Sequence, residues 1–265
     1  MGEQKFLHLE NIEKRFPIQG KEDYIAVTDV NLEIKKNEII SIIGHSGCGK
    51  STLLNMISGL DKETEGHIFL KGKQIVGPGP DRAVVFQNHS LLPWLSVYQN
   101  IEMAIKKVMP ELNPAELRAR VETYISMVNL DHAKDKLPSE ISGGMKQRVG
   151  IARALSIDPD VLLMDEPFGA LDSLTRANLQ EHLMRIQQKV ENTVIIITHD
   201  IDEAVLLSDR VIMMTNGPEA TIGEILEVNL PRPRNRVALQ HDEEYIRCRE
   251  SILSFLYEKF AKEDE

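Results

Sequence analysis

Residues 44–52 constrain the fold of this chain more than any other stretch of its sequence. They read Gly-His-Ser-Gly-Cys-Gly-Lys-Ser-Thr, which matches the spacing G-x-x-x-x-G-K-S. The apolar run Ile39–Ile43 precedes them and predicts a buried strand, and residues 53–60 carry apolar side chains at helical spacing. A strand, a glycine-rich loop and a helix in this order predict a phosphate-binding loop. The alternative is a glycine-rich turn that binds nothing.

The predicted loop contains the groups that a chain of phosphates needs. Its glycines let successive backbone N–H groups turn inward, and the helix that follows adds the positive end of its dipole. Lys50 is expected to reach the β- and γ-phosphates, and the Ser51 hydroxyl is expected to bind Mg²⁺. The predicted nucleotide ligands in this segment are Gly44, His45, Ser46, Gly47, Cys48, Gly49, Lys50, Ser51 and Thr52.

Composition narrows the class of partner. The 265 residues carry a formal net charge of −10, which argues against nucleic acid because phosphate backbones are bound by clustered lysine and arginine. The sequence has no apolar run of about 18 residues, the length needed to span a membrane. Its first residues lack the apolar segment of a secretory signal, and its two cysteines are too far apart in sequence to indicate a disulfide framework. We therefore expect a cytosolic protein.

Apolar patterning predicts an α/β core with a helical insertion. Helices are expected to begin near Ser96, at the pair Asn113-Pro114 and at Ser142, because these residue types favour helix N-caps. Strands are expected over residues 5–12, 25–34, 39–43, 83–86, 161–164, 194–198, 210–215 and 221–228, with a hairpin over 67–76 and helices over 173–190 and 241–262. The predicted domains are a core of residues 1–87 and 158–230, a helical subdomain of residues 88–157, and a C-terminal linker and helix of residues 231–265.

Two further apolar strands end in side chains that fit phosphate chemistry. The strand over residues 161–164 leads into Asp165 and Glu166. Asp165 can lie beside Mg²⁺, and Glu166 can polarise a water molecule for attack on the γ-phosphate. The strand over residues 194–198 leads into His199, which would lie near the phosphates if this strand neighbours the other two strands, 39–43 and 161–164. An acidic strand end without a catalytic role and a purely structural histidine remain alternatives.

The segment Ser142, Gly143 and Gly144 predicts a second anion-binding helix end. A serine and two glycines at a helix start offer a hydroxyl and free N–H groups. A chain with one phosphate loop has no evident need for two such ends. On these residues alone, an ordinary capped helix is the simpler interpretation.

Taken together, these segments resemble the ATP-binding subunit of ABC transporters over roughly residues 5–228. The phosphate loop is followed in the family's order by Gln87, the signature residues 141–147, Asp165 with Glu166, residues 170–172 and His199. The signature departs from Leu-Ser-Gly-Gly-Gln only at its ends, where Ile141 and Met145 stand. The resemblance implies an α/β P-loop NTPase of the ABC-ATPase fold, with an antiparallel β subdomain and an inserted helical subdomain.

The resemblance also implies ATP as ligand, Mg²⁺ as cofactor and a role for each matching residue. The catalytic residues would be Lys50, Glu166 and His199. The Mg²⁺ ligands would be Ser51, Gln87 and Asp165. Two ATPase subunits would pack head to tail through Ser142, Gly143, Gly144 and Asp172, and the nucleotide of one would meet Ser142, Gly143, Gly144 and Gln147 of the other. Phe16 would stack on adenine, with Tyr24 as the alternative.

The only tryptophan lies in an apolar stretch, residues 91–97. In the family that this chain resembles, the corresponding stretch faces a membrane permease. The resemblance therefore implies that Leu92, Pro93 and Trp94 contact the permease. The alternative is that Trp94 is buried between subdomains. The resemblance places the chain at the cytoplasmic face of the inner membrane as a peripheral subunit.

Three segments, residues 91–97, 143–148 and 230–236, resemble importers of nitrate, bicarbonate, cyanate, taurine and alkanesulfonates. Residues 44–48 and 86–97 are most similar to the nitrate and bicarbonate members, so nitrate is the expected cargo and the others are alternatives. The expected partners are permease subunits, an identical or different second ATPase subunit, and indirectly a solute-binding protein. Non-transport ABC ATPases are a competing class, disfavoured by the acidic charge and the lack of sustained heptads.

Overall fold

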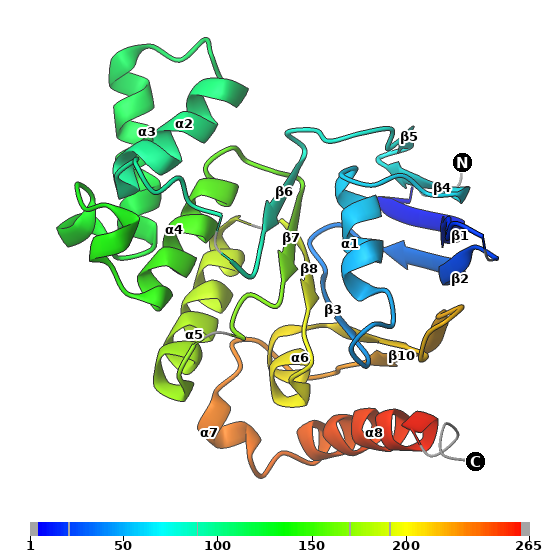
Figure 1. The fold of residues 1–265 in the computed structure, drawn as a ribbon. Coiled ribbons are helices and arrows are strands. Elements are labelled where there is room, and N and C mark those ends of the chain that lie inside the picture. The colour runs from blue at the N-terminus through cyan, green and yellow to red at the C-terminus, as the bar shows by residue number, and fades with distance from the viewer. Residues whose placement is uncertain (1–4, 21, 89, 170, 191, 261–265) are drawn as a thin grey trace. The chain divides into compact units, whose positions relative to one another are not determined.

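The computed structural model describes residues 5–20, 22–88, 90–169, 171–190 and 192–260 (Figure 1). The chain forms two compact units. The first consists of Met1–Pro78 and Thr193–Glu265, and the second of Gly79–Asn192. The phosphate loop belongs to the first unit, and the predicted helical subdomain belongs to the second. The second unit also includes strands and a further helix, so the predicted domain bounds stay a prediction.

The first unit contains an antiparallel sheet in the order β2-β1-β4-β5. Its strands are β1 (Leu7–Phe16), β2 (Tyr24–Ile34), β4 (Glu65–Leu70) and β5 (Lys73–Gln74). Strand β1 extends four residues beyond the expected end at residue 12, with register shifts after Leu9, Ile12 and Lys14. The extension is polar, and it continues because β2 still offers backbone partners, so that Phe16 lies opposite Tyr24.

The first unit also contains the strands that position the phosphate loop. Strand β3 (Ile39–Ile43) pairs in parallel with both β8 (Thr193–Ile197) and β9 (Arg210–Met214), and β10 (Ile222–Glu227) pairs antiparallel with β9. Every residue of β3 and β8 is buried. The Thr198 N–H donates to the Ile42 carbonyl at 3.2 Å, so β3 and β8 end at the same edge of the sheet. The strand that leads to His199 therefore neighbours the strand that leads to the phosphate loop.

Four helices accompany these strands in the first unit: α1 (Lys50–Ser58), α6 (Ile201–Leu207), α7 (Arg236–Leu239) and α8 (Glu243–Phe260). Gly59 ends α1 with a φ of 79°, as its residue type predicts. Helix α6 packs on β3 and on α8, and Figure 1 shows α8 running beside α6. The sequence analysis missed α6, because seven residues are too few to establish a helical period.

The second unit combines two parallel strands with four helices. Strand β6 (Arg82–Val85) pairs with β7 (Val161–Asp165), and α2 (Val97–Val108), α3 (Pro114–Met127) and α4 (Gly143–Leu155) pack on one another. Helix α5 (Ser173–Val190) packs on α4, and two 3₁₀ turns span Asp131–Ala133 and Pro138–Glu140.

The helix starts predicted in the second unit are confirmed. Ser96 and Asn113 each form a full capping box, and the Ser142 hydroxyl accepts from the Met145 N–H. Among the described helices of the whole chain, none combines the length and the apolar composition needed to cross a membrane.

Candidate functional site

The glycines of the phosphate loop meet two different requirements. Gly47 and Gly49 both have a φ of 84°, a left-handed conformation that side chains other than glycine rarely adopt. A Cβ on Gly49 would lie 2.4 Å from Val27 Cγ1, whereas a Cβ on Gly47 would meet no atom within 4 Å. Val27 is fully buried in β2. The antiparallel sheet therefore supports the loop from behind, and only glycine fits at position 49.

Lys50 brings a positive charge into the loop. Its side chain is buried, and its ammonium donates to the carbonyl oxygens of Gly44 and His45, both at 2.7 Å. Lys50 is also the first residue of α1. The first N–H groups of a helix have no acceptor within the helix, and they carry the positive end of its dipole. The ammonium and this helix end give the loop the charge and the donors that polyphosphate requires.

Cys48 can serve a phosphate only through its backbone. The side chain is buried, and burial raises the pKa of its thiol. A Cβ on Gly44 would lie 2.7 Å from Cys48 Sγ, so the thiol fills the space behind the loop. Ser46, Gly47 and Ser51 are exposed, which leaves their polar groups accessible to a ligand.

A hollow of about 470 Å³ adjoins the loop. It is lined by Tyr24, His45, Ser46, Gly47, Asn216, Gly217 and Pro218. Phe16, the residue predicted first for adenine, is not among these lining residues, and the Lys14 ammonium lies 5.0 Å from the centre of its ring. Tyr24 lines this hollow, and the choice between Phe16 and Tyr24 for stacking on adenine stays a prediction.

The segment Asn216, Gly217 and Pro218 was not singled out from the sequence. A breaker directly after the apolar strand β9 was the available signal, because loops at the carboxyl ends of parallel strands commonly hold ligands.

His199 lies two residues after the end of β8 and is exposed. The next residue, Asp200, begins α6: its carboxylate accepts from the Glu203 N–H at 3.0 Å. Its own N–H donates to Thr198 Oγ1, also at 3.0 Å. The backbone on either side of His199 is therefore fixed by a strand and by a capped helix.

In the second unit, β7 carries Asp165 at its end, and Glu166 follows. The Gln87 amide donates to Glu166 Oε2 at 3.2 Å, which brings together two residues that are far apart in sequence. Glu166 has a φ of 44°, a left-handed conformation that costs a side-chain-bearing residue about 1–2 kcal/mol. Such strain at a polar residue points to a functional constraint.

The proposed Mg²⁺ ligands fit the ion in donor chemistry. Mg²⁺ prefers oxygen ligands, and it is usually held by one or two carboxylates together with substrate phosphates. Ser51, Gln87 and Asp165 offer a hydroxyl, an amide oxygen and a carboxylate. Among the described residues, no group of three or more His, Cys, Asp or Glu side chains could hold a metal by itself.

The two signature glycines differ in their surroundings. Ser142 and Gly143 are exposed, and Gly144 is buried. A Cβ on Gly144 would lie 2.4 Å from Thr175 Cγ2 of α5, whereas a Cβ on Gly143 would lie 3.7 Å from Leu171, an ordinary contact. Gly144 is therefore needed for the close approach of α4 and α5 within this chain. Ser142 and Gly143 remain accessible to another molecule.

Two other predicted residues of this region, Gln147 and Asp172, have different surroundings. Gln147 is 0% exposed, so its side chain lies in the interior of the second unit. Asp172 accepts from the Thr175 N–H at 3.1 Å, and hydrogen bonds from Thr175 lower the pKa of its carboxyl. Ala170, which was part of the same predicted motif, lies outside the described residues.

Trp94 is 69% exposed, so the alternative that it is buried between subdomains is wrong. The loop that carries it is fixed by Asn100, a fully buried residue of α2. The Asn100 side chain accepts from the Leu92 N–H at 2.9 Å and donates to the carbonyls of Leu92, Leu95 and Ser96 at 2.9 to 3.2 Å. Sequence reasoning missed Asn100, because its partners are backbone atoms.

Comparison with known proteins identifies the family. The family model described as ABC transporter matches residues 27–169. The chain belongs to the ABC transporter family. This assignment confirms the resemblance to the ATP-binding subunit of ABC transporters.

Among curated relatives, the nitrate transport protein NasD of Klebsiella oxytoca is 56% identical over 257 residues, which are 97% of this chain and 98% of NasD. The bicarbonate transport ATP-binding protein CmpC of Synechocystis sp. is 57% identical over 251 residues, which are 95% of this chain. The chain spans 38% of the length of CmpC. By their names, NasD is a nitrate transport protein and CmpC is an ATP-binding protein of bicarbonate transport.

A solved structure confirms the predicted fold class. The dimeric post-hydrolysis structure of the ATP-binding cassette MJ0796, bound to ADP and Pi, has a TM-score of 0.74 and 33% sequence identity. The match covers 85% of this chain and 100% of that one.

The two left-handed glycines of the phosphate loop make a matched pair for a stability test. Gly47→Ala is expected to lower the free energy of unfolding by about 1 kcal/mol, from backbone strain alone. Gly49→Ala is expected to lower it by a further ~2 kcal/mol, because its Cβ overlaps Val27. Urea denaturation without nucleotide measures both values. Equal losses in the two variants would contradict the packing of β2 against the loop.

Proposed function

We propose that this chain is the ATP-binding and ATP-hydrolysing subunit of an importer for a small inorganic anion. The observation that carries the proposal is the phosphate loop with the Lys50 ammonium bonded to its carbonyls at 2.7 Å, at the N-terminus of α1. Family membership supports the coupling of hydrolysis to transport. The proposed location is the cytoplasmic face of the inner membrane, as a peripheral subunit.

In the proposed mechanism, the phosphate loop binds the triphosphate, and Lys50 neutralises charge that develops on the transferring phosphoryl group. Mg²⁺, held by Ser51, Gln87 and Asp165, would supply further charge neutralisation. Tyr24, or Phe16 as first predicted, packs against the base.

Glu166 and His199 act on the attacking water. Glu166 accepts a hydrogen bond from Gln87, which orients its carboxylate so that it can accept a proton from that water. His199 donates to the γ-phosphate and holds the water in line. Gln87 thereby has a second role, because it positions Glu166.

A second ATPase subunit completes the site. We propose that Ser142, Gly143 and Gly144 of one subunit approach the γ-phosphate held by the other, with Asp172 at the same interface. The exposure of Ser142 and Gly143 supports this role, and a helix start is a suitable anion-binding group. The interior position of Gln147 favours a supporting role behind the signature over direct contact with nucleotide.

The Glu166→Gln variant tests the catalytic assignment. Loss of the base is expected to slow ATP hydrolysis by about 100-fold or more, while ATP still binds and dimers accumulate. Light scattering after size exclusion, with and without ATP, measures the dimer. Lys50→Ala is expected to lose ATP binding, and Glu224→Gln, at an exposed position of β10, serves as the control with normal turnover. Normal hydrolysis by Glu166→Gln would remove Glu166 from its proposed role.

Nitrate is the proposed cargo, and bicarbonate is the second candidate. NasD and CmpC are 56% and 57% identical to this chain, so similarity alone does not separate the two anions. Cyanate, taurine and alkanesulfonates remain further alternatives from the sequence.

The cargo can be tested in the reconstituted complex with permease and solute-binding protein. ATP hydrolysis is expected to rise severalfold with nitrate, since a loaded binding protein favours the closed ATPase dimer. Bicarbonate, cyanate and taurine are added separately at the same concentration and pH. Stimulation by bicarbonate alone would assign the chain to bicarbonate import.

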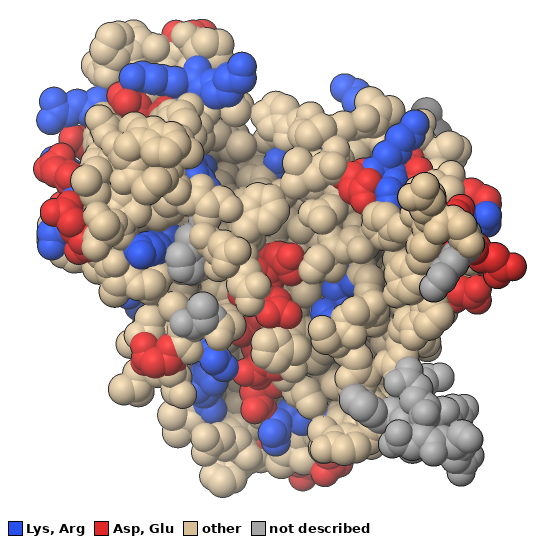
Figure 2. Space-filling view, viewed as in Figure 1, with Lys and Arg blue, Asp and Glu red and all other residues tan. Residues whose placement is uncertain are grey.

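We propose that Leu92, Pro93 and Trp94 contact the permease. An exposed tryptophan on a loop held by Asn100 supports this role, because tryptophan is enriched among the residues that dominate binding energy at interfaces. Nucleic acid is not a proposed partner. On the visible face of the described residues, Figure 2 shows Lys and Arg mixed with Asp and Glu, without a broad basic surface.

Trp94→Ala is expected to weaken co-purification with the detergent-solubilised permease by about tenfold or more, as loss of an interface hot spot does. Val76→Ala is the matched control, because Val76 is 86% exposed and lies in the other unit. Both variants are compared at equal concentration and salt. Equal retention of the two variants would contradict a permease contact at Trp94.

A further inference from the structure

The segment 230–236 matched a family pattern in the sequence, and the proposed function gives it no role. In the structure its second arginine, Arg234, has a side chain that is 1% exposed. The guanidinium donates to the carbonyls of Val205, Leu206 and Ser208 at 2.9, 3.1 and 2.7 Å. It also donates to the Leu230 carbonyl of its own segment at 3.2 Å.

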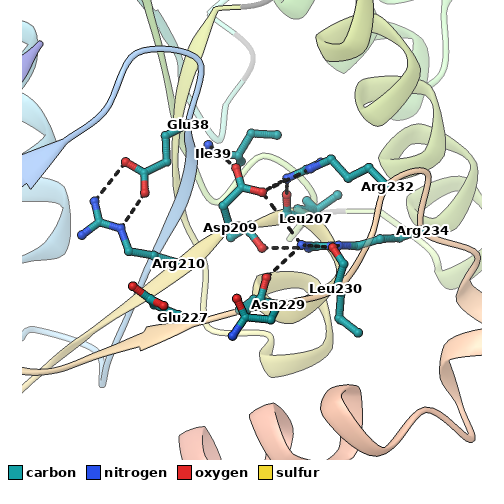
Figure 3. A network of polar contacts seen from close by, with 12 residues as sticks. Glu38, Ile39, Leu207, Asp209, Arg210, Glu227, Asn229, Leu230, Arg232 and Arg234 are labelled. Atoms are coloured by element: carbon teal, nitrogen blue, oxygen red, sulfur yellow. Dashed lines mark hydrogen bonds and ion pairs between the residues drawn. The ribbon is translucent and has the colours of Figure 1, made fainter.

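The first arginine of the segment contacts the same end of α6. Arg232 donates to the Leu207 carbonyl at 2.9 Å and pairs with Asp209 at 2.8 Å. Asp209 in turn accepts from the Ile39 N–H at 2.9 Å, at the start of β3. Figure 3 shows both arginines reaching toward Asp209 from the linker. The segment therefore joins the end of α6 to the strand that leads into the phosphate loop.

These contacts satisfy a need of α6 that its own length cannot meet. The last carbonyls of any helix have no partner within it and carry partial negative charge. A helix of seven residues is also too short to be stable without tertiary contacts. Burial lowers the pKa of the Arg234 guanidinium to about 10, so it remains charged at neutral pH. The buried Arg234 cation therefore stabilises the C-terminal end of this short helix, and the carbonyls of the helix end stabilise the cation.

The first turn of α6 is held as well, by α8. Asp202 accepts from the Tyr245 hydroxyl at 2.8 Å and pairs with Arg249 at 2.5 Å. Further along α8, the Leu256 carbonyl lies 3.3 Å from His45 Nε2 of the phosphate loop. The C-terminal part of the chain thus contacts both ends of α6 and the loop itself.

His199 lies directly before the N-cap of α6. It precedes Asp200, the N-cap of α6, by one residue and Asp202 by three. A rotation or shift of α6 would move His199 relative to the phosphate loop, because no flexible linker separates His199 from α6.

We propose that Arg234 of the linker and Arg249 of α8 act as positioning residues that hold His199 in place for ATP hydrolysis by clamping the two ends of α6. This inference rests on the proposed role of His199. The clamp does not touch nucleotide, so it affects the rate of the chemical step and leaves ATP affinity unchanged.

The test uses the full chain and single-turnover hydrolysis of radiolabelled ATP, with the ATP dissociation constant and the free energy of unfolding measured in parallel. Arg249→Met is expected to slow hydrolysis about tenfold, since misplacing a group by ~1 Å can cost up to about 100-fold. Arg247→Met is the matched control on the same helix, because Arg247 pairs with Glu244, and it is expected to hydrolyse ATP at the normal rate. Arg234→Lys keeps the charge but loses the forked donors, and it is expected to hydrolyse ATP more slowly than Arg249→Met.

A double-mutant cycle separates positioning from general destabilisation. In a His199→Gln background, Arg249→Met is expected to cause no further loss, because its effect acts through the missing imidazole. An additional tenfold loss in that background, or normal hydrolysis by Arg249→Met and Arg234→Lys, would overturn the clamp. A normal rate for His199→Gln alone would instead refute the proposed role of His199, so the two failures are distinguishable. Arg249 is half exposed, so its variant does not depend on tolerance at the buried Arg234.

Discussion

The register of β3 between β8 and β9 is the constraint on which the rest of the first unit depends. A strand buried on both faces has no apolar alternation that could fix its register. Polar groups at its start take over this task. Glu38 pairs with Arg210 at the start of β9, and Asp209 accepts from the Ile39 N–H at 2.9 Å, as Figure 3 shows. With the register fixed there, the phosphate loop and His199 emerge at one edge.

Local signals in the sequence predicted much of the fold. The strand, loop and helix around Lys50, and the caps at Ser96, Asn113 and Ser142, depend on neighbouring residues and were found from them. The extension of β1 to Phe16 and the short helix α6 were not predicted. Both are stabilised by tertiary partners, β2 in the first case and the C-terminal segment in the second, and neither has enough residues to show a period.

The candidate site, like the fold, was predicted from the sequence only in part. Residue type and order identified the loop, Gln87, Glu166 and His199 as a set. The sequence did not indicate that Gly144 is needed inside the chain while Gly143 is exposed, because that difference depends on Thr175 of another helix. Arg234 and Asn100 were missed as organising residues, since both bind backbone atoms, and a backbone partner leaves no trace in the pattern of side chains.

The way in which Asn100 holds its loop has a consequence for how such transporters diversify. Its four hydrogen bonds end on backbone atoms of Leu92, Leu95 and Ser96. The shape of the loop is therefore independent of the side chains that it displays. New side chains at Pro93 and Trp94 can arise without disturbing the scaffold, the phosphate loop or hydrolysis. The proposed permease contact can therefore change its side chains while the hydrogen bonds of Asn100 keep the backbone of the loop in place.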